Sequence, residues 1–229
     1  MSRTEGRRVV ALVPARDEEV SVGMTVASLR ALAVTEVVVV DDGSSDGTAA
    51  AALGAGATVL RIPGHAGKGG AMEGALRRLP SADVWLFADA DLGPTARGLG
   101  VLLEVVVAGR ADMAIAMFPP QADGGLGTVR RASAASIRML SGFVAEAPLS
   151  GQRAVSGACL AAVRPLASGF GVETAMTIDA LRAGYRVLEV PVAGLAHRVT
   201  GRTFRGFAHR GRQGIQIARA AASRAVRLR

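Results

Sequence analysis

Residues 37–40 are four consecutive valines, and this run restricts the fold more than any other feature of the sequence. An unbroken β-branched run is typical of a strand buried on both faces, as in a parallel sheet covered by helices. Around it, the runs predicted as strands in the first half are residues 9–13, 36–41, 57–62 and 84–88. Helical stretches separate these runs. The alternation therefore predicts an α/β fold with a Rossmann-like, mostly parallel sheet flanked by helices.

The remaining elements follow from the same patterns. The predicted helices are residues 22–32, 48–53, 70–79, 99–107, 132–144 and 171–183, the last capped by Gly184. Further strands are predicted at 113–117 and 186–192, and the mixed segment 152–163 is expected to contain a strand near its end. Residues 119–127 are rich in proline and glycine and are predicted to form a loop. No linker divides the 229 residues, so we expect a single domain.

Composition narrows the class of protein. Only 3% of the residues are aromatic while 50% are apolar, so alanine, valine and leucine must fill the core. The single cysteine, Cys159, excludes a disulfide within the chain and is expected to be a small buried side chain in a reducing compartment. No uncharged apolar stretch approaches the roughly 20 residues of a membrane span. We therefore expect a cytoplasmic protein.

The net charge of +8 is concentrated at the C-terminal end. Residues 191–229 contain nine arginines and no acidic residue, and 201–229 is predicted to be a basic helix. Such a block favours an anionic partner, either a phosphorylated substrate, a lipid head group or a nucleic acid. A solvated helix face is the alternative interpretation.

A polar cluster follows each of the first four predicted strands. The clusters are residues 14–19 (PARDEE), 41–48 (DDGSSDGT), 65–70 (HAGKGG) and 89–91 (DAD). Ligands of open α/β sheets bind at the carboxyl ends of the strands, so the four clusters are expected to meet at one edge. No single one of these motifs is as specific as their convergence.

Asp89 and Asp91 directly follow the apolar run 84–88. Alternate residues of a strand point the same way, so two carboxylates at this spacing can face one site. Oxygen ligands of this kind suit Mg²⁺ or Mn²⁺, which keep coordination places for substrate phosphates. The pair is a candidate metal site. In the alternative interpretation, the aspartates only form a turn.

Two further clusters suit a nucleotide. Lys68 is the only lysine of the sequence, and it lies between glycines at the start of a predicted helix. Glycines allow close backbone approach and a helix N-terminus favours an anion, so this segment suits a diphosphate. In the cluster 41–48, Asp41 or Asp42 can accept a hydrogen bond from the imide N–H of a uracil. The sequence leaves open which one does so, and the cluster is also a turn sequence.

Together, the segments 14–19, 39–48, 67–69 and 89–91 resemble family 2 glycosyltransferases with the nucleotide-sugar-binding GT-A fold. The resemblance implies a nucleotide-sugar donor half at 1–100, an acceptor half at 101–200, and Asp91 as the main metal carboxylate beside Asp89. It also implies Lys68 near the donor. The residues that it assigns to the nucleoside are Pro14, Ala15, Glu18 and Asp42.

The second half resembles glucosyl-3-phosphoglycerate synthases in residues 169–181 and 196–198. This resemblance implies that Glu173 lies near the reacting sugar and that His197 is a third metal ligand. Residues 124–130 resemble the acceptor loop of that family, in which Thr128 and Arg130 would hold a phosphate.

The same half is also similar to soluble homologues of polyprenyl-phosphate sugar transferases, through Gln152 and residues 184–192. That likeness implies a basic tail lying against an acidic membrane surface at the inner face of the membrane.

The expected activity is therefore metal-dependent transfer of a sugar from a nucleotide-diphosphate donor, such as a UDP-sugar, to 3-phosphoglycerate or a polyprenyl phosphate. Glu173 would be the general base if configuration inverts, and would position the sugar if configuration is retained. No nucleic-acid partner is expected, and a homodimer stays open.

Two rival functions remain. A nucleotidyltransferase that makes nucleotide sugars normally needs a glycine-rich loop after the first strand, where residues 14–18 have no glycine. A nucleic-acid-binding protein would use the arginine-rich tail, but stacking aromatic residues are scarce.

Overall fold

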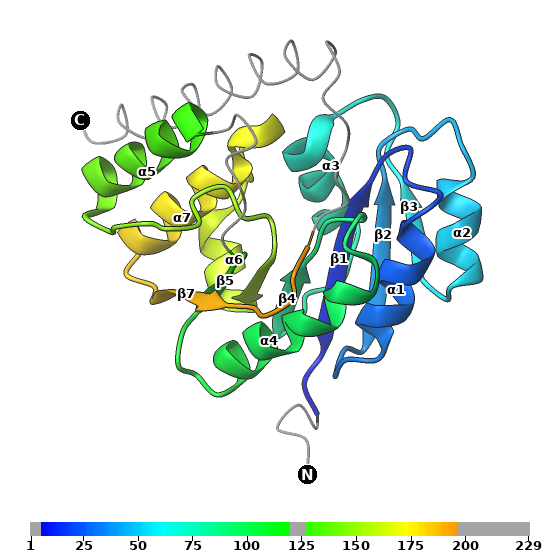
Figure 1. Cartoon of the computed structure of the whole chain (residues 1–229), viewed down its shortest axis with the longest axis horizontal. Coiled ribbons are helices and arrows are strands. Elements are labelled where there is room, and N and C mark those ends of the chain that lie inside the picture. The colour runs from blue at the N-terminus through cyan, green and yellow to red at the C-terminus, as the bar shows by residue number, and fades with distance from the viewer. Residues whose placement is uncertain (1–5, 120–126, 197–229) are drawn as a thin grey trace.

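The computed structural model describes residues 6–119 and 127–196, and a seven-stranded sheet runs through this part of the chain (Figure 1). Its strand order is β3-β2-β1-β4-β6-β5-β7. Only β6 runs antiparallel to its neighbours, β4 and β5, so the sheet is mostly parallel as predicted. The strands are β1 (Val9–Ala15), β2 (Glu36–Asp41), β3 (Thr58–Arg61), β4 (Val84–Phe87), β5 (Met113–Met117), β6 (Arg153–Ser156) and β7 (Val187–Pro191).

Helices cover both faces of the sheet. One face packs against α1 (Val22–Arg30), α2 (Thr48–Gly54), the 3₁₀ helix η1 (Gly93–Leu99) and α4 (Gly100–Val107). The other face packs against α3 (Gly67–Leu76), α6 (Gly157–Val163) and α7 (Val172–Arg182), the last preceded by the 3₁₀ helix η2 (Gly169–Gly171). Helix α5 (Gly127–Ser141) lies alongside α7 (Figure 1).

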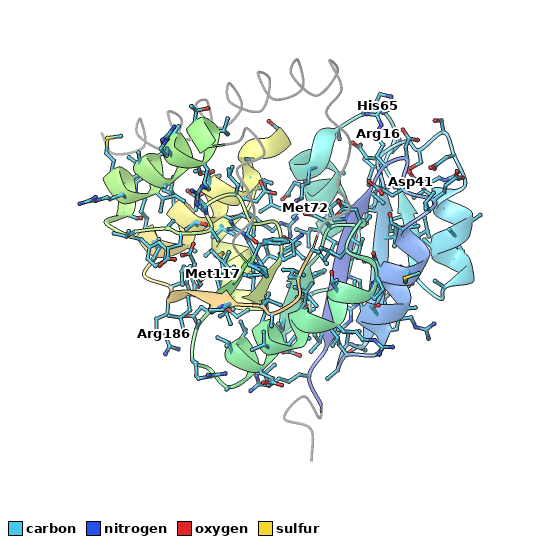
Figure 2. All side chains as sticks on the ribbon, in the orientation of Figure 1. Arg16, Asp41, His65, Met72, Met117 and Arg186 are labelled. Carbon is cyan, nitrogen blue, oxygen red and sulfur yellow. The ribbon has the colours of Figure 1, made fainter. Side chains whose placement is uncertain are left out.

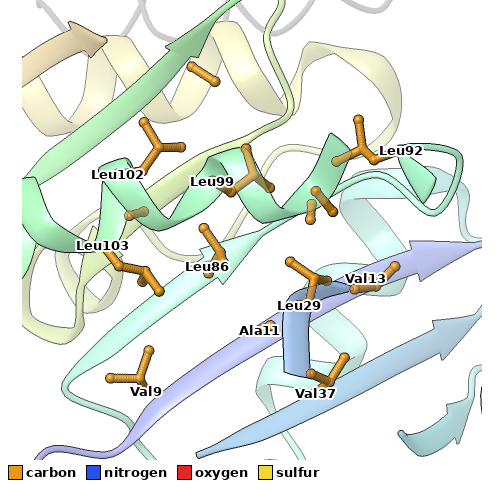
Figure 3. Close-up of a cluster of buried hydrophobic side chains, with 14 of the residues drawn as sticks. Val9, Ala11, Val13, Leu29, Val37, Leu86, Leu92, Leu99, Leu102 and Leu103 are labelled. Atoms are coloured by element: carbon orange, nitrogen blue, oxygen red, sulfur yellow. The ribbon is translucent and has the colours of Figure 1, made fainter. Parts of the chain in front are cut away.

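The central strand β1 shows why the sequence forms this sheet. Side chains of a strand alternate between its faces, so both sets of apolar residues in β1 must be covered. Val9, Ala11 and Val13 pack in the core on the α1 and α4 face, which Figure 3 shows. Val10 and Leu12 pack in the core on the α3 face. Because residues 9–13 are all buried in one core or the other, this part of the strand is a continuous apolar run.

The topology brings the predicted polar clusters together. Strands β1 to β4 are parallel, so the segments that follow them lie at one edge of the sheet. The direction of winding changes between β1 and β4, and such a switch point is where ligands bind in open α/β sheets. The antiparallel strand β6 begins at this same edge, so residues just before Arg153 also reach it.

Most predicted elements are confirmed to within a few residues, with three differences. Segment 152–163 holds its strand at the start, as β6, and continues as helix α6, so the strand expected near its end is wrong. Helix α5 begins at Gly127 rather than at 132. Strand β4 ends at Phe87, so Asp89 and Asp91 lie in the following turn and not on a strand. Most of the loop predicted at 119–127 and the basic helix predicted at 201–229 lie outside the described residues.

Cys159 is buried as expected, with 0% of its surface exposed. Burial, together with the charge of Asp112, raises the pKa of its thiol to about 12. None of the helices in residues 6–119 and 127–196 has the length and apolar character needed to cross a membrane.

Helix α3 approaches the segment before α7 with backbone against backbone. Gly69 lies in the first turn of α3, and a Cβ at this position would overlap the carbonyl oxygen of Ala167. We expect Gly69→Ala to lower the free energy of unfolding by about 1–3 kcal/mol through overpacking. Gly54→Ala is the matched control, because a Cβ at Gly54 of α2 would meet nothing within 4 Å. Urea unfolding of both variants measures the difference, and equal midpoints would contradict the close approach.

Candidate active site

Lys68 lies between two carboxylates at the carboxyl edge of the sheet. Its Nζ is 2.6 Å from Asp89 Oδ1 and 2.8 Å from Glu173 Oε1. The three side chains come from α3, from the turn after β4 and from the first turn of α7. The Lys68 side chain is 18% exposed and that of Glu173 only 8%. Three residues that the sequence predicted separately therefore form one cluster.

The charge of Lys68 is set by competing effects. Burial by itself would lower the pKa of the ammonium. The negative charges of Asp89 and Glu173, and their hydrogen bonds to Nζ, outweigh burial and raise the pKa above its ordinary value of 10.5. A raised lysine pKa means that this contribution to stability is fully present below the ordinary value and is lost only as the pH rises above it. Lys68 is thus a permanent cation at neutral pH.

Gln152 is a further partner of Asp89, in a contact that the sequence did not predict. Its Nε2 donates to Asp89 Oδ2 at 2.6 Å, so each carboxylate oxygen of Asp89 accepts a bond from a different side chain. The neighbouring residue, Gly151, is required here because a Cβ would meet both Lys68 Nζ and Asp89. The antiparallel pairing of Phe87 with Arg153 brings this segment to Asp89. The resemblance to polyprenyl-phosphate sugar transferases included Gln152 but implied no contact for it, and the strand that follows it was expected elsewhere.

Asp41 and Asp42 are structural to a large extent. Asp41 is 1% exposed, accepts from the backbone N–H of Ser44 at 2.8 Å and pairs with Arg61 at 3.3 Å. The carboxylate of Asp42 accepts from the backbone N–H groups of Ala66 and Gly67 at 2.8 and 3.0 Å. Asp42 therefore links the end of β2 to the start of α3, next to Lys68.

The loops after β1 and β2 are tied to each other. Glu18 donates its backbone N–H to Thr48 Oγ1 at 2.7 Å, and Asp17 Oδ1 accepts from the backbone N–H of Ser45 at 2.8 Å. Pro14 and Ala15 are the last two residues of β1, directly before the first of these loops. Figure 2 shows that Arg16, Asp41 and His65, which lie at or just after the ends of β1, β2 and β3, gather at the same end of the strands. These contacts give the predicted nucleoside residues a fixed framework.

The turn that carries Asp91 is held by α1, and the 3₁₀ helix η1 that follows the turn contacts the segment after β7. Thr25, fully buried on α1, donates to the carbonyl of Ala90 at 2.8 Å and accepts from the backbone N–H of Gly93 at 2.8 Å. Thr95 donates to the carbonyl of Ala196 at 3.1 Å. Asp91 itself is half-buried. The predicted ligand that follows Ala196, His197, lies outside the described residues.

The described residues contain no group of three or more histidine, cysteine, aspartate or glutamate side chains arranged to hold a metal. The local donors are carboxylate oxygens, the type that Mg²⁺ and Mn²⁺ prefer. A cation bound by Asp91 would therefore need further ligands in addition to the described side chains. Mg²⁺ is commonly bound in this way, by one or two carboxylates, water and substrate phosphates.

The predicted acceptor residues, Thr128 and Arg130, are exposed in the first turn of α5. This helix packs on α7 through a buried hydrogen bond of 2.6 Å between Ser133 Oγ and Thr174 Oγ1. Thr174 is the neighbour of Glu173, and Ser133 lies three residues after Arg130. Residues three apart share a helix face, so Arg130 is on the side of α5 that faces α7.

The family model for glycosyl transferase family 2 matches residues 10–158. The chain belongs to this family. A glucosyl-3-phosphoglycerate synthase of Mycobacterium tuberculosis is 30% identical over 221 residues, covering 84% of this chain and 67% of that enzyme. The enzyme of the same name from Mycolicibacterium paratuberculosis is 31% identical over 205 residues, covering 76% of this chain and 60% of the relative. This chain thus matches 60% to 67% of the length of these two relatives.

Solved structures agree with the family. A glucosyl-3-phosphoglycerate synthase from M. tuberculosis in complex with Mn²⁺, UDP-glucose and phosphoglyceric acid has a TM-score of 0.79 and 27% identity, covering 97% of this chain and 81% of that one. The same enzyme with Mg²⁺ and UDP gives a TM-score of 0.82 at 27% identity, covering 97% and 80%. The expected GT-A fold and the expected family 2 glycosyltransferase are confirmed.

Because Lys68 is the only lysine, one NMR signal from protein labelled with ¹³C-lysine reports its charge. We expect the wild-type Cε signal to stay at its charged position through pH 10.5, the ordinary pKa. Glu173→Gln and Asp89→Asn remove a negative partner while leaving the burial, so the midpoint should move downward. Glu104→Gln, at an exposed position on α4, is the control and should leave the signal unchanged. A midpoint that is the same in all four proteins would contradict the ion-paired cluster.

Proposed function

We propose that the protein transfers a sugar from a UDP-sugar to a phosphorylated acceptor, with Mg²⁺ or Mn²⁺ as cofactor. The observation that carries the proposal is the cluster of Lys68, Asp89 and Glu173 at the sheet edge of a family 2 chain. The ligands bound in the similar synthase structure, UDP-glucose, phosphoglyceric acid and Mn²⁺, support the choice of substrate classes.

The loops after β1, β2 and β3 hold the nucleoside in this proposal. Pro14, Ala15 and Glu18 provide one wall, which the contacts to the β2 loop keep rigid. Asp42 is the candidate for the uracil imide, because it is more exposed than Asp41, 6% against 1%, and lies beside the start of α3. Its backbone-bound carboxylate has lone pairs left for one more donor.

Asp91 is the main carboxylate for the cation, and Asp89 acts in a different way. Both oxygens of Asp89 already accept hydrogen bonds from Lys68 and Gln152, which suits a group that orients its neighbours. His197 is proposed as a further ligand, since the residue before it accepts a hydrogen bond from Thr95 of η1, the 3₁₀ helix that follows Asp91. When bound, a divalent cation neutralises negative charge on the departing diphosphate.

Lys68 and Glu173 act on the sugar end of the donor. An ammonium has three N–H donors, and two of those of Lys68 are used by Asp89 and Glu173. The third can bond the donor, while Glu173 accepts from a sugar hydroxyl. Glu173 is 8% exposed at its side chain and bonded to Lys68, which favours a positioning role over that of a free general base. The bond from the anomeric carbon to the diphosphate oxygen breaks, the acceptor hydroxyl oxygen bonds to that carbon, and the hydroxyl proton passes to the departing diphosphate.

Asp91→Asn tests the donor site by stability. UDP with Mn²⁺ should raise the melting temperature of the wild type, because a ligand that binds only the folded state stabilises it. We expect Asp91→Asn to lose the part of the shift that requires both UDP and Mn²⁺, while Glu104→Gln keeps it. The measurement is a thermal shift assay with UDP, Mn²⁺ or both. A full shift in Asp91→Asn would refute the assignment.

Arg130→Ala tests the acceptor side. Removing a cation that pairs with the acceptor phosphate should raise the KM for 3-phosphoglycerate about tenfold or more, with the KM for UDP-glucose unchanged, since charge-assisted hydrogen bonds are worth about 1.5–3 kcal/mol. Arg131→Ala removes the same charge from the next position of α5 and serves as control. Steady-state kinetics with each acceptor, including a polyprenyl phosphate, decide the class. Equal effects of the two variants would remove Arg130 from the site.

A further inference from the structure

Arg153 is a charged side chain in the centre of the protein. It begins β6, is 1% exposed and is one of the largest fully buried side chains in the described chain. No carboxylate of residues 6–119 or 127–196 lies within 4.0 Å of its guanidinium. Burial lowers its pKa to about 10, while the charges of Glu173 and Glu189 act in the opposite direction, so it remains charged at neutral pH. A buried charge without a counter-ion is costly to fold.

The guanidinium joins two different parts of the fold. Its Nε donates to the carbonyl of Ser150 at 2.8 Å, in the segment that precedes β6. Its Nη1 donates to Thr177 Oγ1 on α7, also at 2.8 Å. Thr177 in turn donates to the backbone carbonyl of Glu173 at 3.0 Å. One side chain thus connects the segment carrying Gln152 to the helix carrying Glu173.

These bonds close a ring around the proposed active site. Ser150 Oγ donates to Gln152 Oε1 at 3.3 Å, and Gln152 Nε2 donates to Asp89. Asp89 and Glu173 both hold Lys68. In order, the ring is Lys68, Asp89, Gln152, Ser150, Arg153, Thr177, Glu173 and back to Lys68.

We propose that Arg153 is a positioning residue, which acts through this ring to hold Asp89 and Glu173 at the spacing that keeps Lys68 in place for sugar transfer. This inference rests on the proposed function. Its physical basis is that Arg153 touches both arms of the ring but none of the three charged groups of the cluster.

A purely structural role explains Arg153 less well. The Nη2 nitrogen is buried and has no hydrogen-bond partner among the described residues, so the guanidinium is not fully satisfied. An apolar side chain of similar volume would fill the same space without the desolvation penalty. Charged groups that lower stability are typical of functional sites, where geometry matters more than stability.

Thr177→Val provides the sharpest test, with Thr174→Val as its matched control. Both threonines are buried on α7, at 1% and 0% exposure, and both donate or accept through Oγ1. Only Thr177 belongs to the ring, since Thr174 bonds Ser133 of α5. The two substitutions remove similar polar groups and should lower the stability by similar amounts.

We expect Thr177→Val to lower kcat for sugar transfer roughly tenfold or more with little change in the KM for UDP-glucose, because small misplacements of reacting groups are costly. The ¹³C signal of Lys68 should shift in this variant. Thr174→Val should keep both kcat and the signal. Arg153→Met should behave like Thr177→Val, and Arg153→Lys, which keeps the charge and one donor, should recover part of the rate.

Equal kcat values and equal Lys68 signals in the two threonine variants would overturn the proposal, and so would a shifted signal with an unchanged rate. If the wild-type protein transferred no sugar, the proposed function would fail. The Lys68 signal would then still show whether Arg153 and Thr177 position the cluster.

Discussion

The candidate active site depends on one electrostatic constraint, the ammonium of Lys68 placed between the carboxylates of Asp89 and Glu173. A lysine that is 18% exposed keeps its charge only when negative partners compensate for the loss of water. The partners come from positions 21 and 105 residues further along the chain. The parallel sheet, the turn after β4 and the start of α7 must therefore be in register with one another for the cluster to exist.

Close packing around two glycines brings these segments near enough for the three charged side chains to form hydrogen bonds. A side chain at Gly69 would displace α3 from the segment before α7, and one at Gly151 would intrude between Lys68 and Asp89. A second ionic link supports the same contact, since Glu73 of α3 pairs with Arg164 at 3.0 Å and accepts from the backbone N–H of Leu166 at 3.1 Å. The glycines and the Glu73–Arg164 ion pair thus fix the distance between α3 and the segment before α7.

The features that could be predicted from the sequence are those encoded within a short stretch of residues. The valine run, the polar clusters after the strands and the glycines around Lys68 each have a signal within a few residues, and the resemblance identified Glu173. What it missed is long-range. Gln152 and Arg153 reach the site only because β6 runs antiparallel between β4 and β5, and a four-residue strand carries too little periodicity to reveal its direction. The bracing role of Asp42 depends likewise on backbone groups at residues 66 and 67.

The same charges bear on the cation of the proposed function. Among the described residues of the cluster, the two carboxylates of Asp89 and Glu173 carry one more charge than the single ammonium of Lys68. The distant Arg153 offsets that charge only in part, since it contacts neither carboxylate. In the proposed function, a diphosphate brought to this edge would approach these carboxylates, and a divalent cation would reduce the repulsion between them. In the proposed function, Lys68 thus serves the geometry of the sugar site, and the metal balances the charge of the leaving diphosphate.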